Sequence, residues 1–162
     1  MKKSQTLASK PSKPSKSSVP SLDFFLRLSR AQAVVVRRLD NTLGSIHGLS
    51  FNDFQLLLYL QRAPAGKLRR IDLAERLALT ASGVTRQLLP LEKIGLVSRQ
   101  ADPTDARVGY AQITSSGAAL LLNATKTAEQ LGTELLQARG LESTNEMNAV
   151  LEKIAGMNLS NS

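Results

Sequence analysis

The 162-residue sequence contains no cysteine and a single histidine, His47, and both facts restrict the chemistry available to the chain. Without cysteine there is no disulfide framework, thiolate nucleophile, peroxide-sensing thiol or cysteine zinc site. One histidine is too few for a transition-metal site, and no nucleophile-elbow sequence accompanies it. No acid–base pair or phosphate-binding loop is recognisable either. We therefore expect no metal, no cofactor and no enzyme activity.

Long apolar runs are also missing. No stretch approaches the roughly 20 apolar residues that span a bilayer, and the first residues lack the apolar segment of a secretory signal. The apolar fraction of 42% still suffices for a packed core, although aromatic residues make up only 4%. We expect a cytoplasmic protein that does not contact membranes.

Acidic residues are scarce in two parts of the chain. The net charge is +8; residues 1–20 carry five lysines and no acid, and residues 62–107 carry nine basic against five acidic groups. Residues 108–162 have the opposite balance, with three basic and five acidic groups. This asymmetry points to a polyanionic partner, most simply nucleic acid, although a solvated surface would show the same charge.

The first 20 residues are rich in Lys, Ser and Pro and poor in apolar groups, so we expect a disordered basic tail. A long helix is predicted from Leu22, and Gly44 and Gly48 mark its end. Ser50 is the predicted N-cap of a second helix, which Pro64 and Gly66 end. The segment 67–69 is too short to assign alone and is compatible with a small strand.

Two helices are predicted after residue 114. Thr114 caps the first, which extends to about Ala138, and Gly140 follows it; Ser143 begins the second. The apolar stripes of the first and fifth helices extend farther than one small domain needs. A stripe without a partner in its own chain usually finds one in another chain. We expect a homodimer, the alternative being a monomer in which these helices pack on each other.

The segment 73–96 has the pattern of a helix-turn-helix. A short helix ends in the turn 78–80, and Thr80 caps the next helix. In that second helix, apolar residues at spacings of four and seven are predicted to point inward; they are Val84, Leu88 and Leu91. Its outer face begins with small and polar residues, which allow close approach to a DNA major groove. A surface helix of a bundle without a ligand would show the same pattern.

A β-hairpin is predicted directly after this motif. Gly95 ends the helix, a strand begins at Leu96, Asp102-Pro103-Thr104-Asp105 is a turn sequence, and residues 108–113 return as a second strand. A helix-turn-helix followed by a hairpin is a winged helix. The fold expected is therefore mainly α with a small β wing, dimerising through the N- and C-terminal helices.

The sequence from Ile71 to Leu121 resembles the MarR family of bacterial winged helix-turn-helix transcription regulators. The elements L-A-x-x-L, V-T-R, L-E-x-x-G-L-V, D-P-x-D-x-R and I/L-T-x-x-G occur in the family's order and spacing. The resemblance implies a dimer that binds double-stranded DNA at a pseudo-palindromic operator. It also implies that a small anionic aromatic ligand releases the DNA.

The resemblance also assigns residues. It places DNA contacts in the recognition helix and the wing, at Ser82, Gly83, Thr85, Arg86, Gln87, Asp105 and Arg107. Arg99, on the outgoing strand, is a further DNA-binding candidate, because arginine suits the negative potential of a narrow minor groove. Arg69 and Arg70 are predicted phosphate contacts or pocket cations. His47, Tyr59 and Arg70 are the candidate ligand-binding residues.

Pro90 departs from the expected pattern, because proline inside a helix removes a backbone donor and clashes with the carbonyl four residues earlier. We expect a kink or break near Leu88. The domains predicted are a tail (1–20), a dimerisation helix (21–48), a winged helix-turn-helix (49–114) and C-terminal dimerisation helices (115–162). The predicted function is that of a sequence-specific, dimeric repressor in the bacterial cytoplasm, associated with the nucleoid. The alternative is a winged-helix architectural or protein-interaction module.

Overall fold

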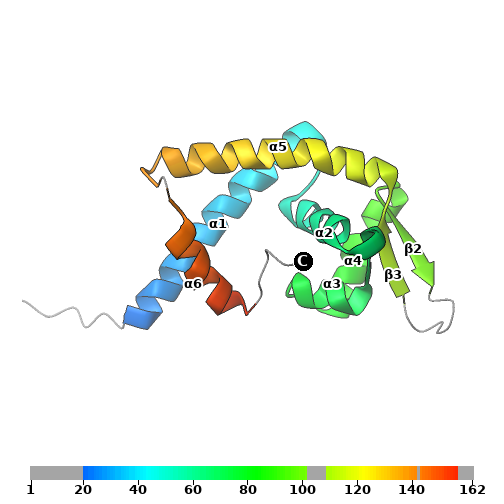
Figure 1. Ribbon diagram of the computed structural model, residues 1–162, viewed down its shortest axis with the longest axis horizontal. Coiled ribbons are helices and arrows are strands. Elements are labelled where there is room, and N and C mark those ends of the chain that lie inside the picture. The colour runs from blue at the N-terminus through cyan, green and yellow to red at the C-terminus, as the bar shows by residue number, and fades with distance from the viewer. Residues whose placement is uncertain (1–19, 102–108, 142, 157–162) are drawn as a thin grey trace, which may run out of the picture. The chain divides into compact units, whose positions relative to one another are not determined.

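The computed structural model describes residues 20–101, 109–141 and 143–156. The chain divides into two compact units, Met1–Val34 and Val35–Ser162. Helix α1, Pro20–His47, begins in the first unit and ends in the second. The elements that follow are shown in Figure 1: α2 (Phe51–Arg62), a 3-10 turn (Pro64–Gly66), β1 (Lys67–Arg69), α3 (Arg70–Arg76), α4 (Ala81–Lys93), β2 (Val97–Ala101), β3 (Gly109–Ile113), α5 (Ser115–Gln137) and α6 (Asn145–Ala155).

The predicted elements are present, with small shifts at their ends. Helix α1 begins at Pro20, passes through Gly44 and ends before Gly48, whose φ of +68° is left-handed. Helix α6 begins at Asn145 rather than at Ser143. The tail up to residue 19 and the predicted wing turn at residues 102–105 lie outside the described residues.

Side-chain caps fix the starts of three helices, as predicted. The amide of Asp53 donates to Ser50 Oγ at 3.1 Å, and the Asp53 carboxylate accepts from the Ser50 amide in return. The amide of Gly83 donates to Thr80 Oγ1 at 3.1 Å. The third cap, at Thr114, holds α5 in the same way. These bonds satisfy amides that have no partner inside the helix, and each is worth about 1 kcal/mol.

The three strands form an antiparallel sheet in the order β1-β3-β2. In the β2–β3 hairpin Val97 pairs with Ile113, which confirms the wing strands. The undecided segment 67–69 is the third strand, with Arg69 opposite Tyr110. The sheet therefore ties the start of α3 directly to the returning strand of the wing.

In the core of the second unit, buried side chains of α2 pack with those of the helix-turn-helix and of α5. Its fully buried side chains are mainly leucines: Leu43, Leu49, Leu56, Leu57, Leu60, Leu73, Leu88 and Val84. The inward positions predicted for α4, Val84, Leu88 and Leu91, are all buried. Burial of such a side chain contributes roughly 1.5–3 kcal/mol, so the inner face of α4 is held firmly.

Of the kink or break predicted near Leu88, the break is wrong. Helix α4 runs without interruption from Ala81 to Lys93 and contains Pro90 in its last turn but one. Leu88 and Leu91, on either side of the proline, are 0% and 2% exposed. Their burial offsets the roughly 3 kcal/mol that an interior proline costs.

Candidate nucleic-acid interface

The helix-turn-helix consists of α3, the turn at residues 77–80 and α4. Ala78 has a φ of +51°, a left-handed conformation that lets the chain reverse between the helices. The amide of Leu79 donates to the carbonyl of Ala74 at 2.8 Å and closes the turn. Ala74 is buried and small, so α4 crosses α3 closely.

The first two turns of α4 present small and polar groups to solvent. Ser82 and Arg86 are exposed, and Thr85 is half-buried. The Thr85 hydroxyl donates to the carbonyl of Ala81 at 3.0 Å. Its single proton is thereby used, so the hydroxyl oxygen can only accept a further hydrogen bond. Gly83 lies in the first turn, where its amide makes the capping bond. The helix terminus itself carries a partial positive charge that favours a phosphate.

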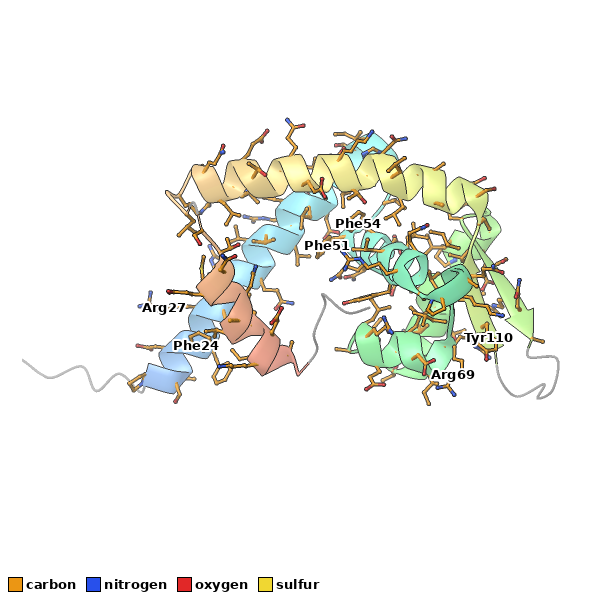
Figure 2. All side chains as sticks on the ribbon, in the orientation of Figure 1. Phe24, Arg27, Phe51, Phe54, Arg69 and Tyr110 are labelled. Atoms are coloured by element: carbon orange, nitrogen blue, oxygen red, sulfur yellow. The ribbon has the colours of Figure 1, made fainter. Side chains whose placement is uncertain are left out.

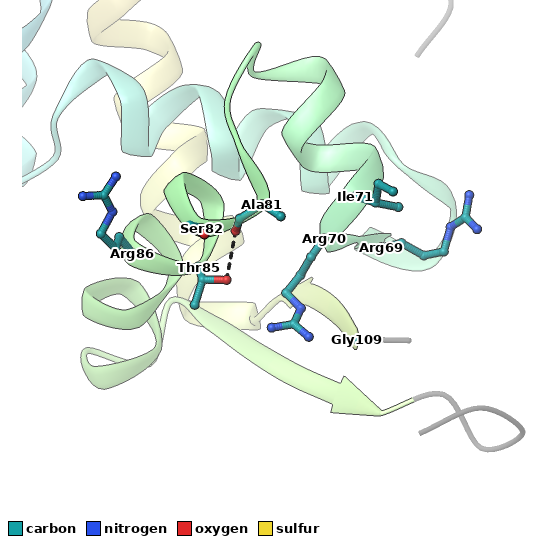
Figure 3. A pocket seen from close by; sticks show the side chains of 8 residues that line it. All are labelled: Arg69, Arg70, Ile71, Ala81, Ser82, Thr85, Arg86 and Gly109. Carbon is teal, nitrogen blue, oxygen red and sulfur yellow. Dashed lines mark hydrogen bonds between the residues drawn. The ribbon is translucent and has the colours of Figure 1, made fainter. Parts of the chain in front are cut away.

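A groove of about 670 Å³ lies beside this face (Figure 3). It is lined by Arg69, Arg70, Ile71, Ala81, Ser82, Thr85, Arg86 and Gly109. The lining comes from four elements, because β1, α3, α4 and β3 meet here. The sequence interpretation missed Ile71 and Gly109. The pairing of β1 with β3, which places Gly109 here, requires the three-residue strand that the sequence left undecided.

The two adjacent arginines of this groove differ in their surroundings. Arg69 donates from Nε and Nη2 to the two carboxylate oxygens of Asp72, both at 2.9 Å. This hydrogen bonding and the negative charge of Asp72 raise the pKa of Arg69 above its usual value. In Figure 3 the Arg69 side chain points away from α4, whereas that of Arg70 extends toward Thr85 and Gly109.

Arg99 connects the wing to the recognition helix. Its Nε donates to Glu92 Oε1 at 2.5 Å, which joins β2 to the last turn of α4. Only Nε takes part in this pair, and the Arg99 side chain is 43% exposed, so its Nη groups can contact DNA while the pair is intact. Among the predicted wing residues, Asp105 and Arg107 lie outside the described residues.

Gln87 is the recognition-helix candidate that faces inward. Its residue is half-buried, and its side-chain nitrogen is buried without a hydrogen-bond partner among the described residues. The other four candidates lie in the first two turns of α4: Ser82, Gly83, Thr85 and Arg86.

The three ligand candidates occupy separate environments. His47 Nε2 lies 2.8 Å from Thr127 Oγ1 of α5. Tyr59 is 9% exposed and belongs to the core, and Arg70 lines the groove described above. Of these three residues, only Arg70 therefore lines the groove beside α4.

A second cavity of about 310 Å³ lies between the second half of α1, α2 and α5. Its lining is largely apolar, with Arg62 and Glu129 as charged members: Val35, Leu39, Phe51, Phe54, Leu58, Arg62, Thr125, Ala128, Glu129, Gly132 and Leu135. The rings of Phe51 and Phe54, labelled in Figure 2, stack with centroids 6.1 Å apart.

None of the described helices contains an apolar stretch that would cross a bilayer. Over the same part of the chain, no group of three or more His, Asp or Glu side chains is arranged to hold a metal ion.

Comparison with known proteins places this geometry in a family. A sequence model of the MarR family matches residues 47–108. The HTH-type transcriptional regulator MhqR of Bacillus subtilis is 34% identical over 101 residues, which are 62% of this chain and 68% of MhqR.

Two solved structures have the same fold. The transcriptional regulator BldR of Sulfolobus solfataricus superposes with a TM-score of 0.78 at 28% identity, over 85% of this chain and 95% of BldR. Sco3205 of Streptomyces coelicolor, a MarR family regulator solved in complex with DNA, gives a TM-score of 0.72 at 24% identity, over 89% of this chain and 88% of its own.

The family model covers the helix-turn-helix, and MhqR is a transcriptional regulator; both findings favour a DNA-binding regulator over a protein-interaction module. The chain belongs to the MarR family of winged helix-turn-helix transcription regulators.

Proposed function

We propose that the chain is a dimeric repressor that recognises its operator with the first two turns of α4. The observation that carries the proposal is the exposed N-terminal face of α4 beside a groove lined by arginines. A recognition helix enters the major groove by its N-terminal residues, and those residues here are small or polar. Sco3205, which shares the fold, was solved in complex with DNA, and this supports DNA binding by the chain.

Arg86 is the proposed base-contacting residue. It is exposed and follows the small residues of the first turn, so its guanidinium has room to reach a guanine edge. A bidentate contact of this kind is worth about 1–3 kcal/mol of discrimination. Ser82, Gly83 and Thr85 are proposed to approach the DNA closely, and Gln87 to support the helix from within. The proposed contacts of Arg99, Asp105 and Arg107 would belong to the wing.

A dimer would present two such helices to a pseudo-palindromic operator. In the proposed division of the chain, residues 21–48 and 115–162 dimerise, residues 49–114 bind DNA, and residues 1–20 are a basic tail. Such a protein would act in the bacterial cytoplasm, at the nucleoid, and would not be an enzyme.

The ligand proposed is a small anionic aromatic compound. The cavity of about 310 Å³ offers stacked aromatic rings and one arginine, Arg62, which together suit an aromatic ring bearing a negative charge. The cavity touches α2 and α5, so occupation can change how the DNA-binding part is held. A ligand acts by favouring the conformation that it binds best.

The test is a mobility shift with the DNA upstream of the protein's own coding sequence, against random duplex as competitor. The expected result is a complex that random DNA displaces only at large excess. Equal competition by both duplexes, with a steep salt dependence alone, would instead support the architectural alternative.

A further inference from the structure

Arg70 is the first residue of α3, and the strand register places it next to the wing. β1 and β3 pair with Lys67 opposite Gln112, Leu68 opposite Ala111 and Arg69 opposite Tyr110. Extending this antiparallel register by one residue sets Arg70 opposite Gly109. The side chain of Arg70 thus starts at the root of the wing and reaches the groove beside α4 (Figure 3).

Gly109 provides the space in which the Arg70 guanidinium lies. A Cβ atom built on Gly109 would be 2.6 Å from Arg70 Nη2, 2.7 Å from Nε and 2.9 Å from Cζ. Cζ is the farthest of the three atoms, so the Nε–Nη2 edge of the guanidinium is the part nearest to Gly109. Any larger residue at position 109 would have to displace Arg70, because real Cβ atoms do not approach so closely.

The orientation determines what the guanidinium can bind. Because the Nε–Nη2 edge lies beside Gly109, the Nη1 side of the group is turned away from it, and the side chain lines the groove. A guanidinium edge presents donors in a fork that matches two oxygens of a phosphate. The neighbouring Arg69 is different, since its fork is occupied by the carboxylate of Asp72.

We propose that Arg70 binds a DNA backbone phosphate next to the bases that α4 contacts, and that Gly109 is a positioning residue which holds Arg70 in place. This inference rests on the proposed function, because it takes α4 as the recognition helix. Phosphate contacts fix the register of a protein on the duplex without recognising sequence. Arg70 would therefore contribute affinity, whereas Arg86 contributes discrimination.

The experiment is a fluorescence anisotropy titration of operator and random duplexes over a series of salt concentrations. The proteins are the wild type, Arg70→Gln, Gly109→Ala and the double variant. Arg70→Gln should weaken binding to both duplexes by about 10-fold and lower the salt slope by about 1. Gly109→Ala should do the same although it removes no charge, and the double variant should bind no more weakly than Arg70→Gln alone.

Matched control variants distinguish the loss of the positioned Arg70 guanidinium from a loss of charge or stability elsewhere in the protein. Lys93→Gln removes one positive charge from the far end of α4, outside the groove, and Gly44→Ala makes the same backbone change in α1, where the nearest atom, Leu49 O, is 3.9 Å from the added Cβ. Both should bind DNA like the wild type. Thermal melting of every variant establishes that it is folded at the titration temperature, and Arg70→Gln, which keeps Gly109, tests the phosphate contact without any new clash.

The inference is overturned if Arg70→Gln leaves affinity and salt slope unchanged, or if Gly109→Ala and Arg70→Gln weaken binding additively. The proposed function is tested separately in the same titration. Wild-type protein that does not distinguish operator from random duplex, or Arg86→Ala that distinguishes them as well as the wild type, would contradict the role of α4 rather than that of Arg70.

Discussion

A single hydroxyl, that of Thr114, joins the end of the recognition helix to the wing and to α5. It accepts a hydrogen bond from the amide of Gly117 at 3.0 Å. It also lies 2.7 Å from the carbonyl oxygen of Gly95 and 3.1 Å from that of Leu96, and donates its proton there. Thr114, which the sequence predicts as the cap of α5, therefore also links α5 to the segment between α4 and β2, because the same oxygen both accepts and donates.

The close packing around this hydroxyl makes Gly117 sensitive to substitution. A Cβ at Gly117 would overlap the carbonyl oxygen of Leu96 and lie 3.0 Å from Ile113 Cγ1. Gly117→Ala should lower the free energy of unfolding by about 1–3 kcal/mol, since α5 must move away from the wing strands. Urea denaturation measures the change.

Gly132→Ala is the control for this prediction. Gly132 also lies inside α5, but nothing lies within 4 Å of a Cβ added there. Alanine in a helix interior is favoured over glycine by roughly 0.5–1 kcal/mol, so this variant should be as stable as the wild type or more stable. If the two variants lose stability equally, steric overlap at Gly117 is not the cause.

Some site residues could be predicted from sequence and others could not, for definable reasons. Ser82, Thr85 and Arg86 follow from a capped helix with a regular apolar face, so their outward position is a matter of periodicity. Gly109 lines the groove only because β1 pairs with β3, a contact between residues 41 to 45 positions apart along the chain. The Arg99–Glu92 pair likewise depends on how the hairpin packs on α4.

At the scale of elements, α4 shows how packing overrides local preference. The proline rule predicts an interruption near Leu88, yet the helix continues to Lys93. Periodicity correctly identifies Leu88 and Leu91 as buried, and it is this burial that holds the helix together across Pro90. The rule considers the backbone alone, so it could not include that compensation.

Pro90 should nevertheless cost stability. Pro90→Ala restores an amide that can donate to the carbonyl of Arg86 and removes the ring clash, so the free energy of unfolding should rise by about 1–3 kcal/mol. Chemical denaturation followed by circular dichroism measures it. A variant of unchanged or lower stability would show that the backbone of α4 is already adapted to proline.

At the scale of the whole molecule, two helices carry apolar side chains that the described chain leaves uncovered. In α1, Leu22, Phe25 and Leu26 are 55%, 55% and 60% exposed. In α6 no residue is buried, although Met147, Val150, Leu151 and Ile154 share one face. Exposed apolar faces of this kind mark interaction surfaces, which favours association of two copies.

Sedimentation velocity tests this association. The wild type should sediment with twice the mass of one chain, and the double variant Leu151→Lys/Ile154→Lys should shift toward the monomer and bind operator DNA more weakly. Glu152→Lys makes the same change in charge on another face of α6 and should remain dimeric. A monomeric wild type, or a double variant that stays fully dimeric, would contradict the proposed role of α6.

The central claim is that this chain recognises a DNA sequence through α4, and selection from a pool of random duplexes tests it most directly. The wild type should enrich an inverted repeat whose half-sites lie about 10 base pairs apart, one helical turn, or a multiple of it. Arg86→Ala should enrich a repeat that is relaxed at one position in each half-site. Enrichment of no common sequence by the wild type, or of the same sequence by both proteins, would contradict the account.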